Sequence, residues 1–209
     1  MRQMDMPRAE PDMSKFNRSL PLPYELRVAD FEMAMRDVYD FFFDVNSFML
    51  NKGLPRLEDM LRPANLSGTL SDMITSSLAK HSRSLTENQY FNGHPDLIVK
   101  GRYGNDSIKA GEFGVEIKST RKPGGAVDTH GAREQTLSTW VYAVDTDASK
   151  PAHKRSPLRF REVYIAEVKV ADFRRNARGE LGTRTATLHA KGLAGFRDSW
   201  VYRDVASAS

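Results

Sequence analysis

The chain contains no cysteine. A sequence without cysteine excludes disulfide bonds, zinc sites with cysteine ligands and thiol catalysis. It also lacks an uninterrupted apolar run of membrane-spanning length, and residues 1–11 have no apolar core of the kind that a signal peptide needs. We therefore expect a cytoplasmic protein that has no membrane partner.

Two further absences narrow the chemistry. The glycines form no phosphate-binding loop that ends in Lys-Ser or Lys-Thr, so no ATP-binding motif is visible. Four of the histidines show no metal-ligand spacing with one another: His81, His94, His153 and His189. The sequence gives no indication of a nucleotide-driven enzyme or of a histidine-based zinc site.

The composition is that of an ordinary globular domain. The 209 residues are 40% hydrophobic and 28% charged, with a formal net charge of +4. From Lys118 to the end there are 17 Lys and Arg against 10 Asp and Glu, so the positive charge is concentrated in the second half. A basic half suits a polyanion such as DNA, but a merely basic soluble surface explains it equally well.

The first half is predicted to be helical. Residues 1–22 contain several prolines among polar residues and are expected to form a flexible or extended arm before a single domain over residues 23–209. Pro23 can begin a helix over Tyr24–Asn51 that ends near Gly53. Apolar residues recur there at steps of three and four, which predicts core packing, with a dimer interface as the alternative: Val28, Phe31, Met35, Val38, Phe42, Val45 and Met49.

A second helix and a set of strands follow. Leu70, Met73, Ile74 and Leu78 predict a helix that is capped near Ser67 or Thr69 and ends before Asn88. Six later segments are rich in β-branched and aromatic residues: 97–100, 113–120, 139–144, 162–170, 184–189 and 199–202. Turns are expected at 104–106, 123–125, 176–182 and 192–195, and a basic exposed loop at 147–157. This order predicts an α/β (α+β) fold with a central mixed sheet flanked by helices.

One of these strands carries a carboxylate and an ammonium group on the same face. Alternate side chains of a strand share a face, so Glu116 and Lys118 point one way, while Phe113, Val115 and Ile117 point into a core. If this strand pairs with the preceding one through a turn near Gly104–Ser107, residues whose numbers sum to about 212 face each other. Asp96 then lies opposite Glu116.

Two adjacent carboxylates repel each other unless a cation lies between them. Oxygen ligands and retained waters are what Mg²⁺ prefers, and such an ion can bind a phosphate oxygen and lower the pKa of a coordinated water. Lys118 would stabilise charge that develops on phosphorus. These parts suffice for phosphodiester hydrolysis, with an ordinary Glu–Lys surface pair as the alternative.

The segment Pro95-Asp96, followed by Glu116-Ile117-Lys118, resembles the signature of the PD-(D/E)XK nuclease superfamily, which includes many restriction endonucleases. The resemblance implies a restriction-endonuclease-like αβββαβ core. It also implies a metal ion held by Asp96, Glu116 and the main-chain carbonyl of Ile117, with Lys118 assisting the attacking water. A further acidic ligand before the hairpin would be Asp72 or Glu87, unless Asp72 is a solvated residue of a helix's first turn.

Polar residues after the active strand are candidates for DNA contacts. Arg121, Lys122, His130, Arg133 and Gln135 could reach phosphates or base edges, or could belong to a solvated loop. His130 is also considered as a catalytic base or a metal ligand.

These features lead to one functional expectation. We expect an Mg²⁺-dependent endonuclease that cuts double-stranded DNA at a specific sequence, as a type II restriction enzyme does. It would act as a homodimer, and a cognate DNA methyltransferase is a possible partner of the same system. The alternatives are a structure-specific or repair nuclease, a non-catalytic DNA-binding module on the same fold, and a structural protein that assembles through its N-terminal helix.

Overall fold

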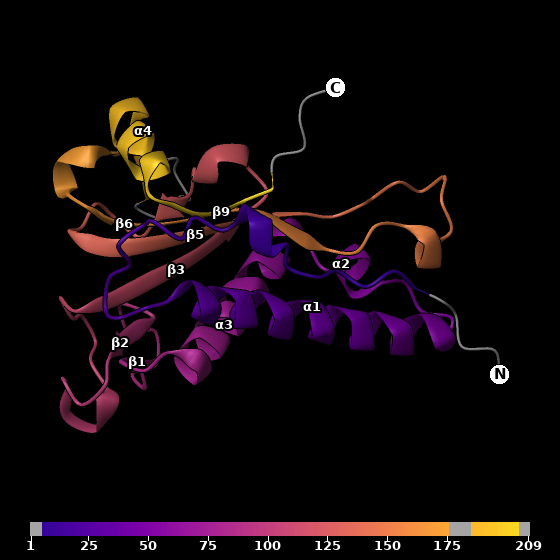
Figure 1. Cartoon of the computed structure of the whole chain (residues 1–209), viewed down its shortest axis with the longest axis horizontal. Coiled ribbons are helices and arrows are strands. Elements are labelled where there is room, and N and C mark those ends of the chain that lie inside the picture. Colours follow the sequence, from indigo (N-terminus) through magenta and orange to yellow (C-terminus); the bar gives the residue numbers. More distant parts are fainter. Residues whose placement is uncertain (1–5, 176–184, 205–209) are drawn as a thin grey trace, which may run out of the picture.

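The computed structural model describes residues 6–175 and 185–204 and has the predicted α+β class. The helices are α1 Val28–Asn51, α2 Leu57–Met60, α3 Pro63–His81 and α4 Ala190–Asp198. The strands are β1 Leu85–Glu87, β2 Leu97–Val99, β3 Gly114–Thr120, β4 Asp128–Thr129, β5 Gln135–Ala143, β6 Arg159–Val168, β7 Phe173–Arg175, β8 Ala186–Leu188 and β9 Trp200–Arg203. As Figure 1 shows, α1 and α3 cover one face of the main sheet and α4 covers the other.

The main sheet is mixed, as predicted. Its order is β1-β2-β3-β5-β6-β9, and a smaller sheet has the order β4-β8-β7. Strands β3 and β5 are parallel, while their neighbours in the main sheet pair antiparallel. The crossover from β3 to β5, residues 121–134, is described throughout and holds a short 3-10 turn and β4 instead of an α-helix. The chain therefore lacks the second helix of an αβββαβ order at this point.

The long helix begins later than the sequence suggests. Tyr24 and Glu25 have positive φ angles of 52° and 54°, which are incompatible with a right-handed helix, so the predicted start at Tyr24 is wrong. Asp30 accepts a hydrogen bond from the main-chain N–H of Arg27 at 2.8 Å and closes the first turn of α1. The predicted end at Asn51 is confirmed, and Gly53 follows with a φ of 74°.

Two separate hydrophobic cores lie on the two faces of the sheet. The apolar stripe of α1 packs into the larger core, where the Phe31 ring stacks on Trp140 at a centroid distance of 5.7 Å. The predicted core packing of Phe31, Met35, Val38, Phe42 and Met49 is thus confirmed, because all five are buried. On the other face, Phe196 of α4 contacts Tyr164 at 5.7 Å in the smaller core.

The N-terminal segment 6–22 packs along this body. It contains a 3-10 turn at Met13–Lys15 and a further turn at residues 18–19. Phe16 is buried in the larger core and forms a bridge to Tyr202 of β9. The guanidinium of Arg8 pairs with Asp40 of α1. The described part of the expected arm is thus anchored to the body at several points.

Three local predictions are corrected. The expected turn at 192–195 is part of α4, which begins after the cap His189; a Cβ at Gly192 would lie 2.6 Å from the carbonyl oxygen of Asp172. In the expected exposed loop at 147–157, Arg155 is buried and forms a two-pronged ion pair with Asp59 at 3.0 and 2.6 Å. The second helix starts at Pro63, ahead of the predicted caps Ser67 and Thr69.

The predicted strands are present with shifted ends. The largest shift is in β5, which begins at Gln135 instead of Thr139. The strand expected at 184–189 is the shorter β8, and the expected turn at 176–182 lies outside the described residues. The strands β1, β4 and β7 are not predicted from the sequence. Each has only two or three residues, which is too short to show a periodic pattern.

Candidate active site

A cleft of about 1100 Å³ opens where the β2–β3 hairpin meets the crossover to β5. One wall consists of residues 92–94 and 108–112, which flank β2 and β3. The other wall consists of residues 129–131 and 133–135 of the crossover and the start of β5. Asp96, Glu116 and Lys118 line the same cleft, so the structure brings the three predicted catalytic residues together.

The predicted hairpin register is confirmed. Leu97 pairs with Val115 and Ile98 with Gly114, and both pairs keep the predicted sum of 212 that sets Asp96 opposite Glu116. The connection is longer than a tight turn, however, because β2 ends at Val99 and β3 begins at Gly114. The 3-10 turn Gly104–Asp106 lies near its middle, as the turn residues there suggest.

The alternation of β3 separates the site from the core. Val115 and Ile117 are fully buried in the larger core, whereas Lys118 faces the cleft with its side chain 24% exposed. Phe113, predicted to point into the core, precedes the strand and is exposed, with the Arg102 guanidinium 4.4 Å from its ring centroid. Gly114 has a φ of 150° and lies against Leu97, whose carbonyl oxygen is 1.9 Å from where a Cβ would be. Only glycine fits here.

Three oxygen groups converge on the ammonium group of Lys118. Its Nζ lies 2.5 Å from Oε1 of Glu116, 3.1 Å from the carbonyl oxygen of Ile117 and 3.8 Å from Oδ2 of Asp96. Asp96 is fixed in turn, because its Oδ2 accepts a hydrogen bond from the Ile117 N–H at 2.8 Å. Both carboxylates and the carbonyl therefore face one small volume.

His94 is a residue of this cluster that the sequence interpretation missed. Its Nδ1 lies 2.7 Å from Oε2 of Glu116, and its side chain is only 16% exposed. Its main chain is also held, since the N–H of His94 donates to the carbonyl of Lys109 and the N–H of Gly111 donates to the carbonyl of His94. The available signal was its position directly before Pro95-Asp96, not any spacing to other histidines.

The electrostatics separate the two carboxylates. Burial and the nearby charge of Glu116 raise the pKa of Asp96 to about 6. Burial also acts to raise the pKa of Glu116, but the hydrogen bond with His94 and the charge of Lys118 outweigh it and bring that pKa to about 2. Burial alone would lower the pKa of Lys118, yet the charges of Glu116 and Asp96 raise it above its ordinary value. Near neutral pH, Glu116 and Lys118 are therefore ionised, and the carboxyl group of Asp96 holds its proton only weakly.

The donor set suits a hard divalent cation. Two carboxylates and one carbonyl are oxygen ligands of the type that Mg²⁺ selects, and the Lys118 ammonium already satisfies them as a positive charge. Within the described part of the chain, no three His, Cys, Asp or Glu side chains are grouped as a metal site. A metal ion at this position would therefore depend on the Ile117 carbonyl and on water for its remaining ligands.

Asp72 lies next to this cluster without joining it. It is an exposed residue of α3, and it lines an adjoining hollow of about 280 Å³ together with Asp96 and Glu87. Its negative charge contributes to the raised pKa of Lys118. This position is compatible with a contact through water to an ion held by Asp96.

The five predicted DNA contacts divide into two groups. His130, Arg133 and Gln135 line the cleft. Arg121 and Lys122 follow the far end of β3 and are exposed outside the cleft lining, with the Arg121 guanidinium 5.7 Å from the ring centroid of Tyr142. The cleft thus brings together only the later part of the predicted set.

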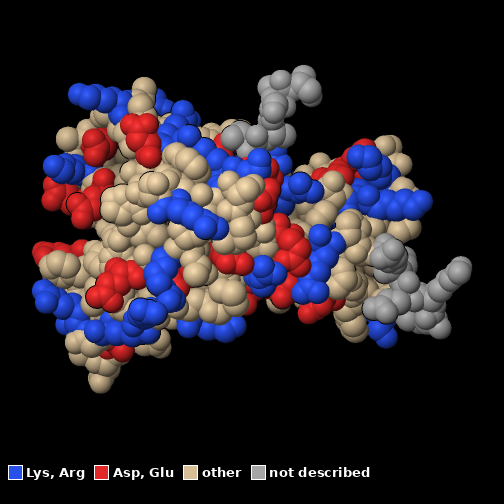
Figure 2. All heavy atoms as spheres, viewed as in Figure 1, with Lys and Arg blue, Asp and Glu red and all other residues tan. Residues whose placement is uncertain are grey.

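Charges of both signs line the cleft. The cations Lys109, Lys118 and Arg133 stand beside four carboxylates, of which Asp96 and Glu116 belong to the cluster and Glu112 and Glu134 do not. Figure 2 likewise shows Lys and Arg interspersed with Asp and Glu over one face of the molecule. A phosphate would therefore enter the cleft more favourably once a divalent cation offsets the carboxylates.

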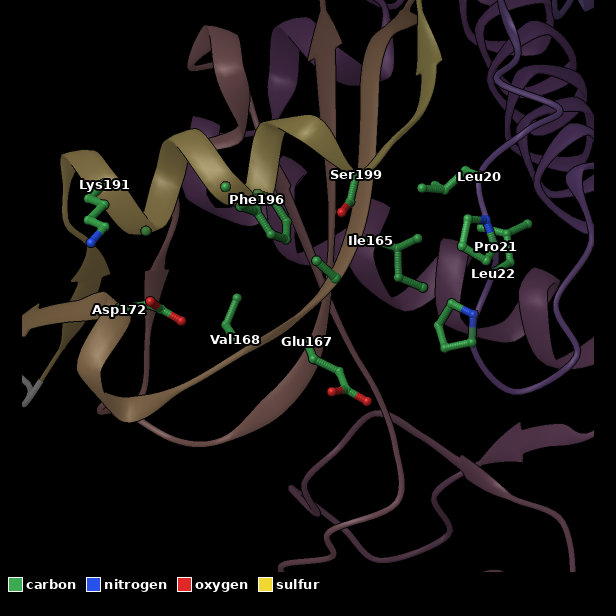
Figure 3. A pocket seen from close by; sticks show the side chains of 14 residues that line it. Leu20, Pro21, Leu22, Ile165, Glu167, Val168, Asp172, Lys191, Phe196 and Ser199 are labelled. Atoms are coloured by element: carbon green, nitrogen blue, oxygen red, sulfur yellow. The ribbon is translucent and has the colours of Figure 1, made fainter.

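Another hollow, of about 770 Å³, lies away from the cleft, between the N-terminal segment, β6 and α4 (Figure 3). Leu20 and Leu22 line one side, Ile165 and Val168 line the sheet side, and Phe196 faces it from α4. None of the described residues that line it also lines the cleft. This hollow is therefore separate from the cleft.

No family model, curated protein or solved structure matches this chain in the comparisons with known proteins. None of the helices in the described part of the chain is long and apolar enough to cross a membrane.

Proposed function

We propose that this chain is an Mg²⁺-dependent endodeoxyribonuclease whose catalytic residues are Asp96, Glu116 and Lys118. The observation that carries the proposal is the convergence of the Asp96, Glu116 and Ile117 oxygens on the Lys118 ammonium group. An ordinary surface pair of Glu and Lys would leave the second carboxylate elsewhere and both side chains solvated. Here Asp96, Glu116 and Lys118 line one cleft of about 1100 Å³.

Each residue has a distinct task in this proposal. Mg²⁺, when bound by Asp96, Glu116 and the Ile117 carbonyl, supplies positive charge to the scissile phosphate and acidifies water. His94 fixes the orientation of Glu116 through the 2.7 Å contact. Lys118 exchanges its carboxylate partners for the phosphate and stabilises the charge that develops on its oxygens.

The arrangement of the strands supports a restriction-endonuclease-like core. A helix, α3, precedes the antiparallel strands β1, β2 and β3, and β5 then pairs parallel to β3. The missing crossover helix is a departure from the αβββαβ order, so the support comes from the hairpin and its residues. Residues 129–131, 133 and 134 of the crossover line the cleft instead.

The proposed substrate is double-stranded DNA cut at a specific sequence, as by a type II restriction enzyme that acts as a cytoplasmic homodimer. The test is to incubate the pure protein with unmodified plasmids from several sources, with Mg²⁺ or with a chelator. Discrete fragments that appear only with Mg²⁺ are expected. Intact plasmids under all conditions would contradict the restriction proposal. Loss of cleavage after treatment with a DNA methyltransferase from the same system would identify the proposed partner.

A structure-specific nuclease of the same fold is the second candidate. The exposed aromatic residues Tyr90 and Phe91 near the cleft favour it, because unpaired bases can stack on such side chains. This enzyme would cut a DNA junction or a flap and leave intact duplex uncut. If wild-type protein binds DNA with Mg²⁺ but cuts none of these substrates, a non-catalytic DNA-binding module is the better description.

A further inference from the structure

Phe91 is the most exposed large hydrophobic residue in the described part of the chain. It is 88% exposed, and its neighbour Tyr90 is 43% exposed. Burial of large apolar side chains lowers the free energy, so two adjacent aromatic residues that both lie exposed to solvent form a candidate contact surface.

Hydrogen bonds hold the turn that carries Phe91 in place. The N–H of Gly93 donates to the carbonyl of Tyr90 at 2.8 Å, and Asn92 has a φ of 54°, so Phe91 stands at the tip of a tight turn. Asn88 braces the turn: its Nδ2 donates to the carbonyl of Ile108 at 2.8 Å, and its Oδ1 accepts from the N–H of Tyr90 at 3.1 Å. These bonds fix the backbone that presents the ring.

This turn is continuous with the candidate active site. Asn92 and Gly93 line the cleft together with His94, which contacts Glu116. Tyr90 lines the adjoining hollow that also contains Asp96. A ligand in the cleft therefore lies next to the segment from which the Phe91 ring projects.

The chemistry around the turn favours one kind of partner. Lys109, His130 and Arg133 line the same cleft and can contact phosphates. Aromatic rings beside cationic side chains are the combination that binds nucleic acids, since the rings stack on bases while the cations pair with the backbone. A protein partner would also cover Phe91, but it would not account for the cleft and its cations.

We propose that the Tyr90–Gly93 turn is a nucleobase-stacking site, in which the Phe91 ring packs on a base of DNA bound in the cleft. The site deepens the proposed nuclease function and rests on it for the identity of the ligand. It implies a preference for DNA in which a base is unpaired or unstacked, because a stacked base in an intact duplex offers no free face, and it therefore favours the structure-specific nuclease over the restriction enzyme.

The test measures binding without relying on cleavage. Labelled 20-nucleotide single strands and their duplexes, each with 2-aminopurine as a stacking reporter, are titrated with protein in Ca²⁺ in place of Mg²⁺. Phe91→Ala is expected to weaken binding of the single strand by about tenfold and to abolish the fluorescence change on binding. Phe91→Trp should restore both. Phe48→Ala is the matched control, because Phe48 is 63% exposed near the far end of α1.

The outcomes separate this inference from the proposed function. Binding by Phe91→Ala that equals the wild type overturns the stacking site, even if the wild type cleaves plasmid. A change in oligomeric state of Phe91→Ala with unchanged DNA binding also overturns it, in favour of a protein contact. If the wild type binds and shows the Phe91 effect but cuts no DNA, the stacking site stands and the nuclease proposal fails.

Discussion

Two clusters of buried charge in this molecule differ in how their charges balance. In the first, Arg56 forms an ion pair with Glu58, and Asn46 donates to the second carboxylate oxygen at 2.8 Å. Both charged side chains are almost completely buried, at 1% and 0% exposure. In the cleft, the two carboxylates Asp96 and Glu116 share the ammonium of Lys118.

The balance determines what each cluster can do. One positive and one negative charge, both buried, balance each other, and Asn46 of α1 contacts both Glu58 and the main-chain N–H of Leu57, so this cluster holds α2 against α1. Two carboxylates around one ammonium leave negative charge facing the cleft. Burial and the charge of Glu116 raise the pKa of Asp96 to about 6. A charge imbalance that opens into a cleft is what distinguishes a candidate site from structural support.

The largest effect on stability is expected when one partner of the Arg56–Glu58 ion pair is removed. Arg56→Ala removes one partner and leaves the carboxylate of Glu58 buried without a counter-ion, so the free energy of unfolding should fall by about 3–5 kcal/mol. Guanidinium denaturation followed by circular dichroism measures it. The double variant Arg56→Met with Glu58→Met is the control and should recover part of the loss; equal stability of Arg56→Ala and wild type would show that the pair is not structural.

The cleft cluster should respond in activity instead. Lys118→Ala is expected to lower the rate of DNA cleavage by about 100- to 1000-fold, because charge on the phosphate loses its stabilising partner. Its unfolding free energy should fall by less than that of Arg56→Ala, since the carboxylates of this cluster line an open cleft that water can enter. Lys150→Ala, a change to an exposed lysine of the 144–158 loop, is the matched control. Unaltered cleavage by Lys118→Ala would refute the role of this residue.

Asp37 of α1 is a carboxylate with several hydrogen-bond donors around it. It accepts hydrogen bonds from Ser77, Lys80 and His81 of α3 at 2.7, 3.0 and 2.9 Å. Burial acts to raise the pKa of Asp37, but these bonds hold it below its ordinary value. Asp37→Asn should lower stability by about 1.5 kcal/mol near pH 7.

The pH dependence gives a second readout for Asp37. A lowered pKa stabilises the folded state above the unfolded-state pKa of about 4, and this stabilisation is lost as the pH falls through the folded value. Denaturation curves of wild type and Asp37→Asn should therefore approach each other below about pH 4. A constant difference down to pH 2.5 would rule out this account of the helix contact.

Asp96→Asn should have the smallest effect on stability, and with the opposite sign. Because the pKa of Asp96 is raised to about 6, the folded state binds more protons than the unfolded state between about pH 4 and 6, and the wild type loses stability as the pH rises through that window. The variant should thus be more stable at pH 8 by about 1 kcal/mol, after allowance for a side chain that is 31% exposed. Thermal unfolding at pH 8 and pH 4 measures it, and a less stable variant at pH 8 would contradict the imbalance.

Patterns that repeat could be predicted from the sequence. The steps of three and four in α1 place a whole stripe in the core, so the existence of the helix follows from them, and Gly53 indicates its C-terminal end. The register of the β2–β3 hairpin also follows, because turn residues near its middle and a period of two set which residues face each other. That register is what brings Asp96 and Glu116 together.

Features fixed by contacts between distant segments could not be predicted in this way. Gly192 and Gly195 indicate a turn, yet packing against Asp172 favours a helix with no side chain at Gly192. Arg155 in a basic segment appears solvated until Asp59, far away in sequence, pairs with it. His94 belongs to the cluster through a residue 22 positions later, a contact that no local pattern reveals.

A titration with a divalent cation tests whether Asp96 and Glu116 hold a metal ion. Mn²⁺ selects the same oxygen ligands as Mg²⁺, and the free ion is counted by its paramagnetic resonance signal during a titration. The account predicts saturable binding by wild type that is weakened at least about tenfold in both Asp96→Asn and Glu116→Gln, and unchanged in Glu134→Gln, an exposed carboxylate of the same cleft. Equal binding by wild type and by both cluster variants would contradict it.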